Sequence, residues 1–362
     1  MRKYLVVCAA MTLLCSLVRA QEADDAGSGA VLSIIPRFDA GMLYDFDGKE
    51  ASFSFGNTSL YTLFEGSFSE KWSFSIANHW VGSDGWAGGA FNDAIGTPTA
   101  DLYSIHLPFK GVDASDWNFL DWAYVTFAPG DLSFTLGKQM LLVGGWEFDD
   151  YDVDVNPLNA SLFWNSFRCY QWGAAIAWDF SDSSAITLQA AASPYNEPMS
   201  FAAQWDGTYG PYSMKWSAMG YRNYWDRNWN ALFCLGNRLE LGDFTLTVDY
   251  FNRCGDPNSI VSSIKGHTLN GSVLWAASDE WELGCKMSYN LADDGNPSTI
   301  NIINDIYNIV PGFYDKESFL MAGATASWCP ADDVRIQVNA GYSDGLGFAL
   351  LGVKYNFDIR IF

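Results

Sequence analysis

Five carboxylates in one short stretch are the side chains in this sequence best suited to chemistry. They fall within eight residues, and no basic residue follows until Arg168: Glu147, Asp149, Asp150, Asp152 and Asp154. In a narrow aqueous passage with low-dielectric walls, such a cluster would concentrate cations and repel anions. We expect an acidic constriction that favours cations or neutral solutes. The alternative is an acidic flap on the outer surface.

Part of this cluster has the spacing of oxygen ligands for calcium, because Asp152, Asp154 and Asn156 read D-x-D-x-N. No glycine or later glutamate completes a twelve-residue calcium loop. The sequence therefore predicts no metal site and no cofactor, with calcium binding by these acids as the alternative.

The histidines give little support for catalysis. The chain has three of them, His79, His106 and His267, with no nucleophile elbow, no H-E-x-x-H motif and no metal-spaced cluster. A hydrolase would need a serine and a histidine together, which leaves His79 with a serine of a neighbouring strand as the catalytic alternative. We expect a protein that is not an enzyme.

The first residues predict export. Arg2 and Lys3 precede an apolar run over residues 4–18, which is shorter than the roughly 20 residues that span a bilayer. We expect cleavage after Ala20, so that residues 1–20 are a signal peptide, residues 21–30 a short periplasmic segment and residues 31–362 one barrel. Cleavage would leave 17 basic residues against 42 acidic ones, a net charge of −25. Such acidity argues against nucleic acid as a partner.

Aromatic residues make up 16% of the chain and include 16 tryptophans, which is high for a soluble domain. Lipid-facing strands and interfacial girdles would use this excess. Trp80, Trp86 and Trp117 could instead line a path for sugars, although a girdle accounts for them more simply. The five cysteines after residue 20 are scattered, and Cys234 and Cys285 would be small packing residues inside strands.

Strands with two different faces must position these groups. In residues 347–362, the apolar side chains of Leu351, Val353, Phe357 and Ile359 alternate with polar ones. Seven short turn signals separate similar segments, at residues 69–71, 129–131, 181–184, 206–210, 242–243, 278–280 and 330–332. They join fourteen strands, and residues 31–44 and 347–362 add one each. The sequence therefore predicts an all-β fold, a transmembrane antiparallel β-barrel of about sixteen strands with short periplasmic turns and long extracellular loops.

Charged residues occur in mid-strand on the polar face, so that face should surround water. The predicted pore-lining residues are Arg37, Asp39, Lys215, Arg238, Glu240, Asp249, Glu282, Lys286, Arg335, Lys354 and Asp358. Rows of acid and base facing each other would set a transverse field, and the same charges would also pair to hold the wall. We expect both contributions.

Four short motifs stand out: Leu-Gly-Lys-Gln at 136–139, Gly-Gly-Trp-Glu-Phe-Asp at 144–149, Gln-Trp-Gly at 171–173 and Gly-Val-Lys-Tyr-Asn-Phe at 352–357. In these motifs the chain resembles bacterial outer-membrane porins, and among them the phosphate-selective porin O/P family and its shorter relatives from Bacteroidetes-like bacteria. The resemblance implies that the loop at residues 141–166, after the fifth strand, folds into the lumen as the third long loop does in such porins. It also implies a homotrimer in outer-membrane lipid.

The sequence departs from that family in two ways. Phosphate-selective members line their pores with many arginines, whereas residues 21–362 contain only 17 basic residues, so phosphate is not carried over. The barrel-assembly machinery reads a terminal aromatic in register with the apolar face. Phe362 is one residue out of register here, so Phe357 and Ile361 are the alternative assembly signal.

Together these features predict a Gram-negative outer-membrane porin that passes small hydrophilic solutes or ions by diffusion. The alternative is a barrel that serves as a scaffold for surface adhesion through its long outer loops.

Overall fold

The computed structural model describes residues 29–46, 49–54, 59–81, 120–147, 161, 170–192, 199–222, 229–254, 266–291, 318–343 and 346–361. The predicted signal peptide and its cleavage site lie outside these ranges. Within them, no helix is long and apolar enough to cross a membrane.

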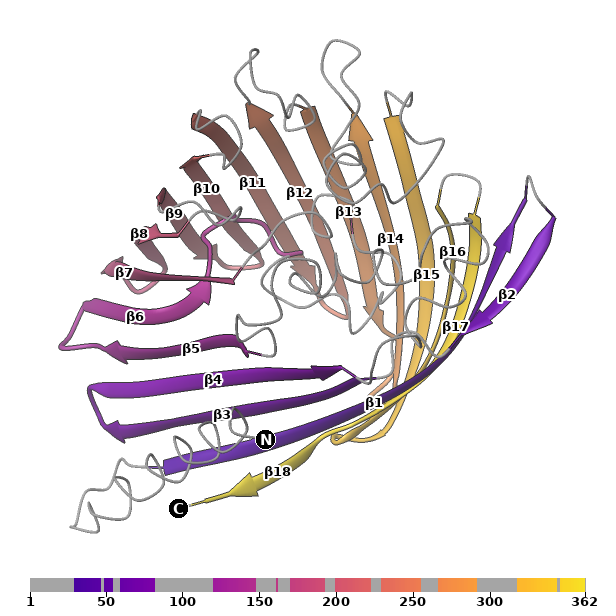
Figure 1. Ribbon diagram of the computed structural model, residues 1–362, viewed down its shortest axis with the longest axis horizontal. Helices are drawn as coiled ribbons and strands as arrows, with labels where there is room; N and C mark the ends of the chain where they lie inside the picture. Colours follow the sequence, from indigo (N-terminus) through magenta and orange to yellow (C-terminus); the bar gives the residue numbers. More distant parts are fainter. Residues whose placement is uncertain are drawn as a thin grey trace, which may run out of the picture.

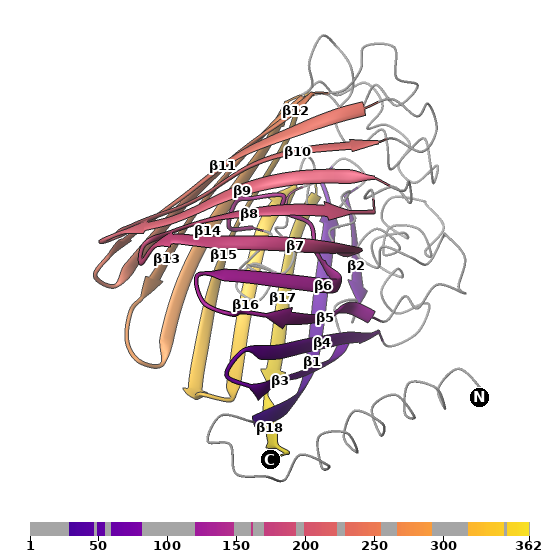
Figure 2. The same ribbon diagram turned by 90° about the vertical axis from the view of Figure 1, so that its left-hand side faces the viewer.

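The described residues form one antiparallel sheet in which consecutive strands pair side by side (Figures 1 and 2). Its strands are β1 (Gly29–Asp45), β2 (Glu50–Ser54), β3 (Ser59–Ser69), β4 (Trp72–Val81), β5 (Leu120–Phe127), β6 (Leu132–Met140), β7 (Tyr170–Ser181), β8 (Ser184–Ala191), β9 (Ser200–Tyr209), β10 (Tyr212–Arg222), β11 (Trp229–Leu241), β12 (Phe244–Cys254), β13 (Gly266–Ala276), β14 (Trp281–Leu291), β15 (Ser318–Ala331), β16 (Val334–Ser343), β17 (Leu346–Tyr355) and β18 (Phe357–Arg360).

Two of these segments do not add a strand to the wall. β2 pairs only with the end of β1, and β18 continues β17 along β1 in an unchanged register across Asn356. The other sixteen close the sheet, because β1 pairs with β3 on one side and with β17 and β18 on the other. We call this last junction the closing seam. The molecule is thus a transmembrane antiparallel β-barrel of sixteen strands, as predicted.

The predicted turns agree with the strand boundaries at five of the seven places. At residues 330–332, β15 runs on to Ala331 and the reversal occurs at Asp332 and Asp333. At residues 206–210, β9 runs on to Tyr209 and the reversal occurs at Gly210 and Pro211. Gly210 has φ 62°, a left-handed conformation that glycine adopts without strain. The turn signal was therefore placed a few residues too early.

The outer face of the barrel is apolar. Large exposed side chains such as Leu136, Ile176, Leu188, Val248 and Leu351 point outward from the middle of their strands. Aromatic side chains, several of them stacked in pairs, flank the short turns around the barrel: Trp72, Phe127, Phe134, Trp178, Phe244, Trp275, Trp281 and Trp328. An apolar band bordered by such a girdle matches the polarity profile of a bilayer.

The inner face is mostly polar but not entirely so. A buried apolar cluster that includes Leu141, Val143, Met219, Leu232 and Phe251 lies against the inside of the wall. The polar inner face is therefore interrupted here by apolar side chains that pack against Leu141 and Val143.

The two cysteines predicted to be packing residues lie on opposite faces. Cys234 belongs to the inner apolar cluster, whereas Cys285 is exposed and alternates with the inward-facing Lys286. Only the first of them packs in a core.

Candidate functional site

The chain leaves the barrel wall after β6 and crosses the interior. Residues 141–147, here called the inward loop, contact β8, β10, β11, β12, β13 and β14, although β6 itself pairs only with β5 and β7. A segment that touches so many strands beyond its neighbours must run along the inside of the barrel.

Two adjacent glycines let the inward loop approach the wall closely. Gly144 and Gly145 have φ of 77° and 75°, a conformation that residues with a Cβ rarely adopt. A Cβ on Gly144 would lie 2.4 Å from Ser217 Oγ, and one on Gly145 would lie 2.9 Å from Phe251 Cζ. On the wall, a Cβ on Gly236 would lie 2.5 Å from Gly145 Cα. Glycine is required on both sides of this contact.

Side chains of the wall hold the backbone of the inward loop. Gln189 of β8 accepts the Leu142 N–H at 3.1 Å and donates to the Met140 carbonyl at 2.8 Å. Ser217 of β10 donates to the Val143 carbonyl. Asp249 Oδ2 of β12 accepts the N–H groups of both Trp146 and Glu147, at 2.9 and 3.0 Å. The path of the loop is thus fixed at three places along the wall.

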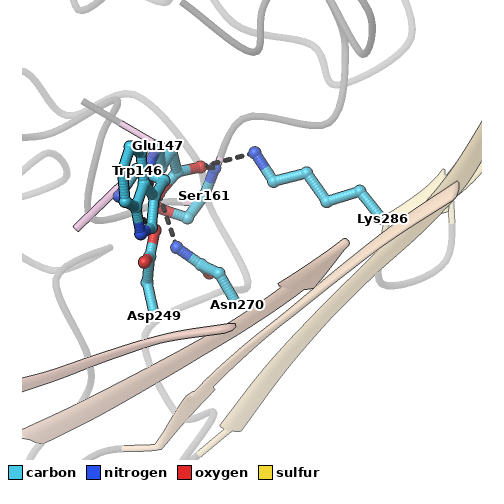
Figure 3. A network of polar contacts seen from close by, with 6 residues as sticks. All are labelled: Trp146, Glu147, Ser161, Asp249, Asn270 and Lys286. Atoms are coloured by element: carbon cyan, nitrogen blue, oxygen red, sulfur yellow. Dashed lines mark hydrogen bonds and ion pairs between the residues drawn. The ribbon is translucent and has the colours of Figure 1, made fainter. Parts of the chain in front are cut away.

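The end of the inward loop is anchored by a buried ion pair (Figure 3). Glu147 Oε1 lies 2.8 Å from Lys286 Nζ, and each side chain is 3% exposed. Asn270 Nδ2 donates to Glu147 Oε2 at 2.6 Å, and the N–H and hydroxyl of Ser161 donate to the two carboxylate oxygens at 2.7 Å each. A buried carboxylate needs this many partners, because desolvation of an ion is costly unless its lone pairs are satisfied. Glu147 therefore acts in this geometry as an anchor.

Trp146 holds two cations of the wall. The indole ring lies 4.4 Å from Lys215 Nζ of β10 and 3.9 Å from Arg238 Cζ of β11, measured to the ring centroid. Cation–π contacts of this kind are strongest where water is excluded. They place both basic groups beside the inward loop.

Two cavities border the inward loop. One, of about 250 Å³, lies between Trp146, Glu147 and the inner face of β11–β14. The other, of about 320 Å³, lies between the loop and β5, β6, β9 and β10 and is lined by Tyr124, Thr126, Gln204 and Lys215. The first is lined by acids and bases, whereas Lys215 is the one charged residue that lines the second among the described residues.

The predicted pore-lining residues alternate with the outward apolar side chains, which places them on the inner face. Asp39, Asp249 and Lys286 are buried there, and Glu240 and Asp358 are exposed. They form three ion pairs among the described residues: Glu147–Lys286 at 2.8 Å, Glu282–Arg335 at 2.6 Å and Arg37–Asp39 at 3.9 Å. At the closing seam, Lys354 lies between Arg37 and Arg335 on neighbouring strands.

Some of the residues named from the sequence lie outside the described ranges. Asp149, Asp150, Asp152 and Asp154 lie outside the described residues, as do Asn156 and Phe362. Phe357 and Ile361 are exposed on the outer face, and the Ile361 N–H bonds the Ala30 carbonyl at 2.9 Å.

The alternatives for metal binding and catalysis can be followed only in part. Among the described residues, no group of three His, Cys, Asp or Glu side chains could hold a metal ion. His79 pairs with Tyr61 through its backbone, but its side chain is outside the description, and the same holds for Trp80. His106, Trp86 and Trp117 lie outside the described ranges altogether. His267 Nδ1 lies 2.7 Å from the Tyr250 hydroxyl.

Sequence reasoning missed several residues that build this site. Trp146 stood within a recognised motif but had no assigned role, and Gln189, Ser217 and Asn270 were not singled out. The pair Gly144–Gly145 was the available signal, because consecutive glycines after a strand indicate a close backbone approach.

A scan against protein-family models finds no match, and neither does a search of curated protein sequences. Among solved structures, the outer membrane channel DcaP of Acinetobacter baumannii matches with a TM-score of 0.59 at 12% identity, covering 92% of this chain and 99% of that one. The chain has the fold of a bacterial porin.

Two further porin-fold structures agree. The anion-selective porin from Comamonas acidovorans matches with a TM-score of 0.57 at 10% identity, covering 91% of this chain and 100% of that one. OmpT, an outer membrane protein of Vibrio cholerae in its trimer form, matches with a TM-score of 0.54 at 10% identity, covering 91% and 99%. At these identities the likeness shows the fold, and the resemblance to the phosphate-selective porin O/P family is not confirmed.

Proposed function

We propose that this protein forms a water-filled channel through the outer membrane of a Gram-negative bacterium and passes small hydrophilic solutes or ions by passive diffusion. The observation that carries the proposal is the inward loop, which is fixed across the inside of a closed barrel with an apolar exterior. A wall suited to lipid outside and a narrowed polar interior are the two requirements of a selective pore.

We further propose that the constriction favours cations or neutral solutes. Support comes from the two residues that flank the acidic run, because Glu147 and Ser161 are hydrogen-bonded to each other inside the barrel. The chain that carries Asp149, Asp150, Asp152 and Asp154 therefore leaves from and returns to one anchored point in the interior. This favours the constriction over the external flap as the role of these acids.

Reconstitution in planar lipid bilayers tests both parts of the proposal. We expect discrete conductance steps, and a reversal potential in a potassium chloride gradient that indicates cation preference. Replacing the four aspartates by asparagine should lower that preference. The matched control replaces four aspartates of the short turns, Asp182, Asp243, Asp279 and Asp332, and should leave it almost unchanged. Absence of conductance steps would contradict the channel and favour the adhesion scaffold.

Assembly and oligomeric state are also part of the proposal. We propose that the chain end is read by the barrel-assembly machinery through Phe357 and Ile361, whose side chains both lie on the outer face. We also propose a homotrimer, on the basis of the porin fold. Chemical cross-linking in native outer membranes should give a trimer band, and a monomer alone would contradict this.

A further inference from the structure

The mixed-charge cavity under the inward loop has the features of a solute site, and the inference drawn from it rests on the proposed channel function. Its volume of about 250 Å³ lies just below the roughly 300–1,000 Å³ of common small-ligand pockets, so it suits a compact solute. Trp146 and Glu147 border it on the loop side, and the inner face of β11–β14 forms its wall.

Strand register gives that wall an ordered pattern of side chains. Asp249 of β12 stands directly opposite Asn270 of β13. The next inward position toward the short turns is occupied by a row of three residues on β11, β12 and β13: Arg238, Thr247 and Ser272. An acidic and amide pair therefore lies beside a row of one guanidinium and two hydroxyl groups.

Three of the residues that line this cavity carry a buried polar atom with no hydrogen-bond partner among the described residues: Asp249 Oδ1, Asn270 Oδ1 and Trp146 Nε1. Both Asp249 and Asn270 are less than 5% exposed. Two of the three atoms are acceptors, on side chains that face each other across neighbouring strands. A buried acceptor without a donor costs free energy, so a solute group that donates several hydrogen bonds would be favoured there.

The charges of the cavity indicate the sign of that group. Three acids and two bases line it: Glu147, Glu240 and Asp249 with Arg238 and Lys286. The buried pair of Glu147 with Lys286 is internally neutral, and Arg238 lies over the Trp146 ring. An entering carboxylate would meet further acceptors at Asp249 and Asn270, whereas a donor with a positive charge would meet a carboxylate.

We propose that this cavity is a transit-binding site for the primary ammonium group of small amino compounds. The ammonium is compact and donates three hydrogen bonds, which matches Asp249 Oδ1, Asn270 Oδ1 and the hydroxyl of Thr247. Where the solute is zwitterionic, its carboxylate faces Arg238 at the other side of the cavity.

Two measurements with the purified protein test this proposal, one of them independent of conduction. Calorimetric titration in detergent micelles should show binding of ethanolammonium but not of ethylene glycol, which lacks the charge, nor of tetramethylammonium, which lacks the N–H donors. In bilayers, ethanolammonium alone should cause brief interruptions of the potassium current. Equal responses to ethanolammonium and tetramethylammonium would overturn the proposal, because they would indicate a general cation effect.

Two variants locate the site. Asp249→Asn keeps an oxygen that can accept the loop N–H groups but removes the charge, and should weaken ethanolammonium binding about tenfold or more. Ser272→Leu fills the cavity opposite Lys286 without removing any group that bonds the loop, and should abolish binding. The matched control is Glu65→Gln on β3, whose carboxylate accepts from Ser75 at 2.7 Å far from the cavity.

The outcomes separate this inference from the channel itself. Unchanged binding in both cavity variants would overturn the ammonium site even where conductance is normal. Binding in micelles without conductance steps would support the site and contradict the channel.

Discussion

Charged side chains on the inner face of the barrel differ in exposure between the part of β12–β14 under the inward loop and the region toward the closing seam. On β14, Lys286 and its partner Glu147 have side chains 3% exposed, and two further residues complete the shell of the carboxylate. Nearer the short turns and the seam, Arg335 of β16 and its partner Glu282, four residues before Lys286 on β14, have side chains 22% and 30% exposed. Both pairs arise from the same alternation of inward side chains. The inward loop makes the difference, because it covers one group and not the other.

The comparison teaches that an inward charge is not automatically a selectivity determinant. Where the loop excludes water, a charge contributes to anchoring the loop and its loss leaves an unpaired ion. Where water remains, screening weakens the pair and the charge acts on passing ions. The experiments below separate these two roles, beginning with the largest expected effect.

Removal of the buried carboxylate of Glu147 should have the largest effect on stability. Glu147→Ala leaves Lys286 buried without its counter-ion and should lower the free energy of unfolding by about 3–5 kcal/mol. Equilibrium unfolding in detergent micelles measures this. The double variant with Lys286→Met should be less destabilised than Glu147→Ala alone, since no uncompensated charge remains. A double variant as unstable as the sum of the single ones would contradict the anchoring role.

Adding one methyl group at the loop contact should have the next largest effect. Gly145→Ala meets Phe251 and Asp249 at 2.9–3.0 Å and should displace the loop, which we expect to raise single-channel conductance. Gly210→Ala is the matched control, because its φ of 62° imposes a similar backbone strain of about 1–2 kcal/mol but nothing lies within 4 Å. Equal conductance in the two variants would show that the loop does not narrow the passage.

Loss of the indole ring should have a moderate effect. Trp146→Leu removes two cation–π contacts and should cost about 1–2 kcal/mol of stability. Lys215 and Arg238 would no longer be held against the ring, so the reversal potential should shift toward anions. Trp146→Phe keeps an aromatic face and should lie between the two. A reversal potential identical in all three proteins would exclude a role of these cations in selectivity.

The smallest stability change is expected near the seam. Arg335→Gln breaks a partly exposed pair and should cost less than about 1 kcal/mol. It also removes one positive charge from the row of Arg37, Lys354 and Arg335, so cation preference should increase. Unfolding and reversal potential together check this. A loss of several kcal/mol would mean that this pair is structural, as the pair of Glu147 with Lys286 is.

Most of the barrel could be predicted because its signal is local. Alternation of side chains and short turn residues are readable within ten residues, and each hairpin repeats the same pattern. β2 escaped prediction because its five residues, Glu50–Ser54, are ordered by pairing with the end of β1 and not by a pattern of their own. The interruption at Asn356 lies beside Pro36 of β1, which has no N–H to donate to a ladder.

The candidate site was less predictable because it is assembled over long sequence separations. Lys286 was expected to face inward from strand parity, whereas Asn270 was not singled out although the same parity places it there. Nothing in the sequence near them indicates that Glu147, 123 and 139 positions earlier, reaches them. That contact depends on where the glycine pair directs the chain after β6, which is a property of the closed barrel.

The closing seam has a consequence for the order of assembly. Ser33 donates to Asp358 at 2.6 Å across a sequence separation of 325 residues. Bringing these residues together in an unstructured chain would cost on the order of 5 kcal/mol in loop-closure entropy. Successive hairpins avoid most of that cost, since each closes a short loop and brings the two ends nearer. The first strand therefore pairs with the last one only after the strands between them have formed. The rate of refolding of this barrel should be limited by the step at which the seam forms.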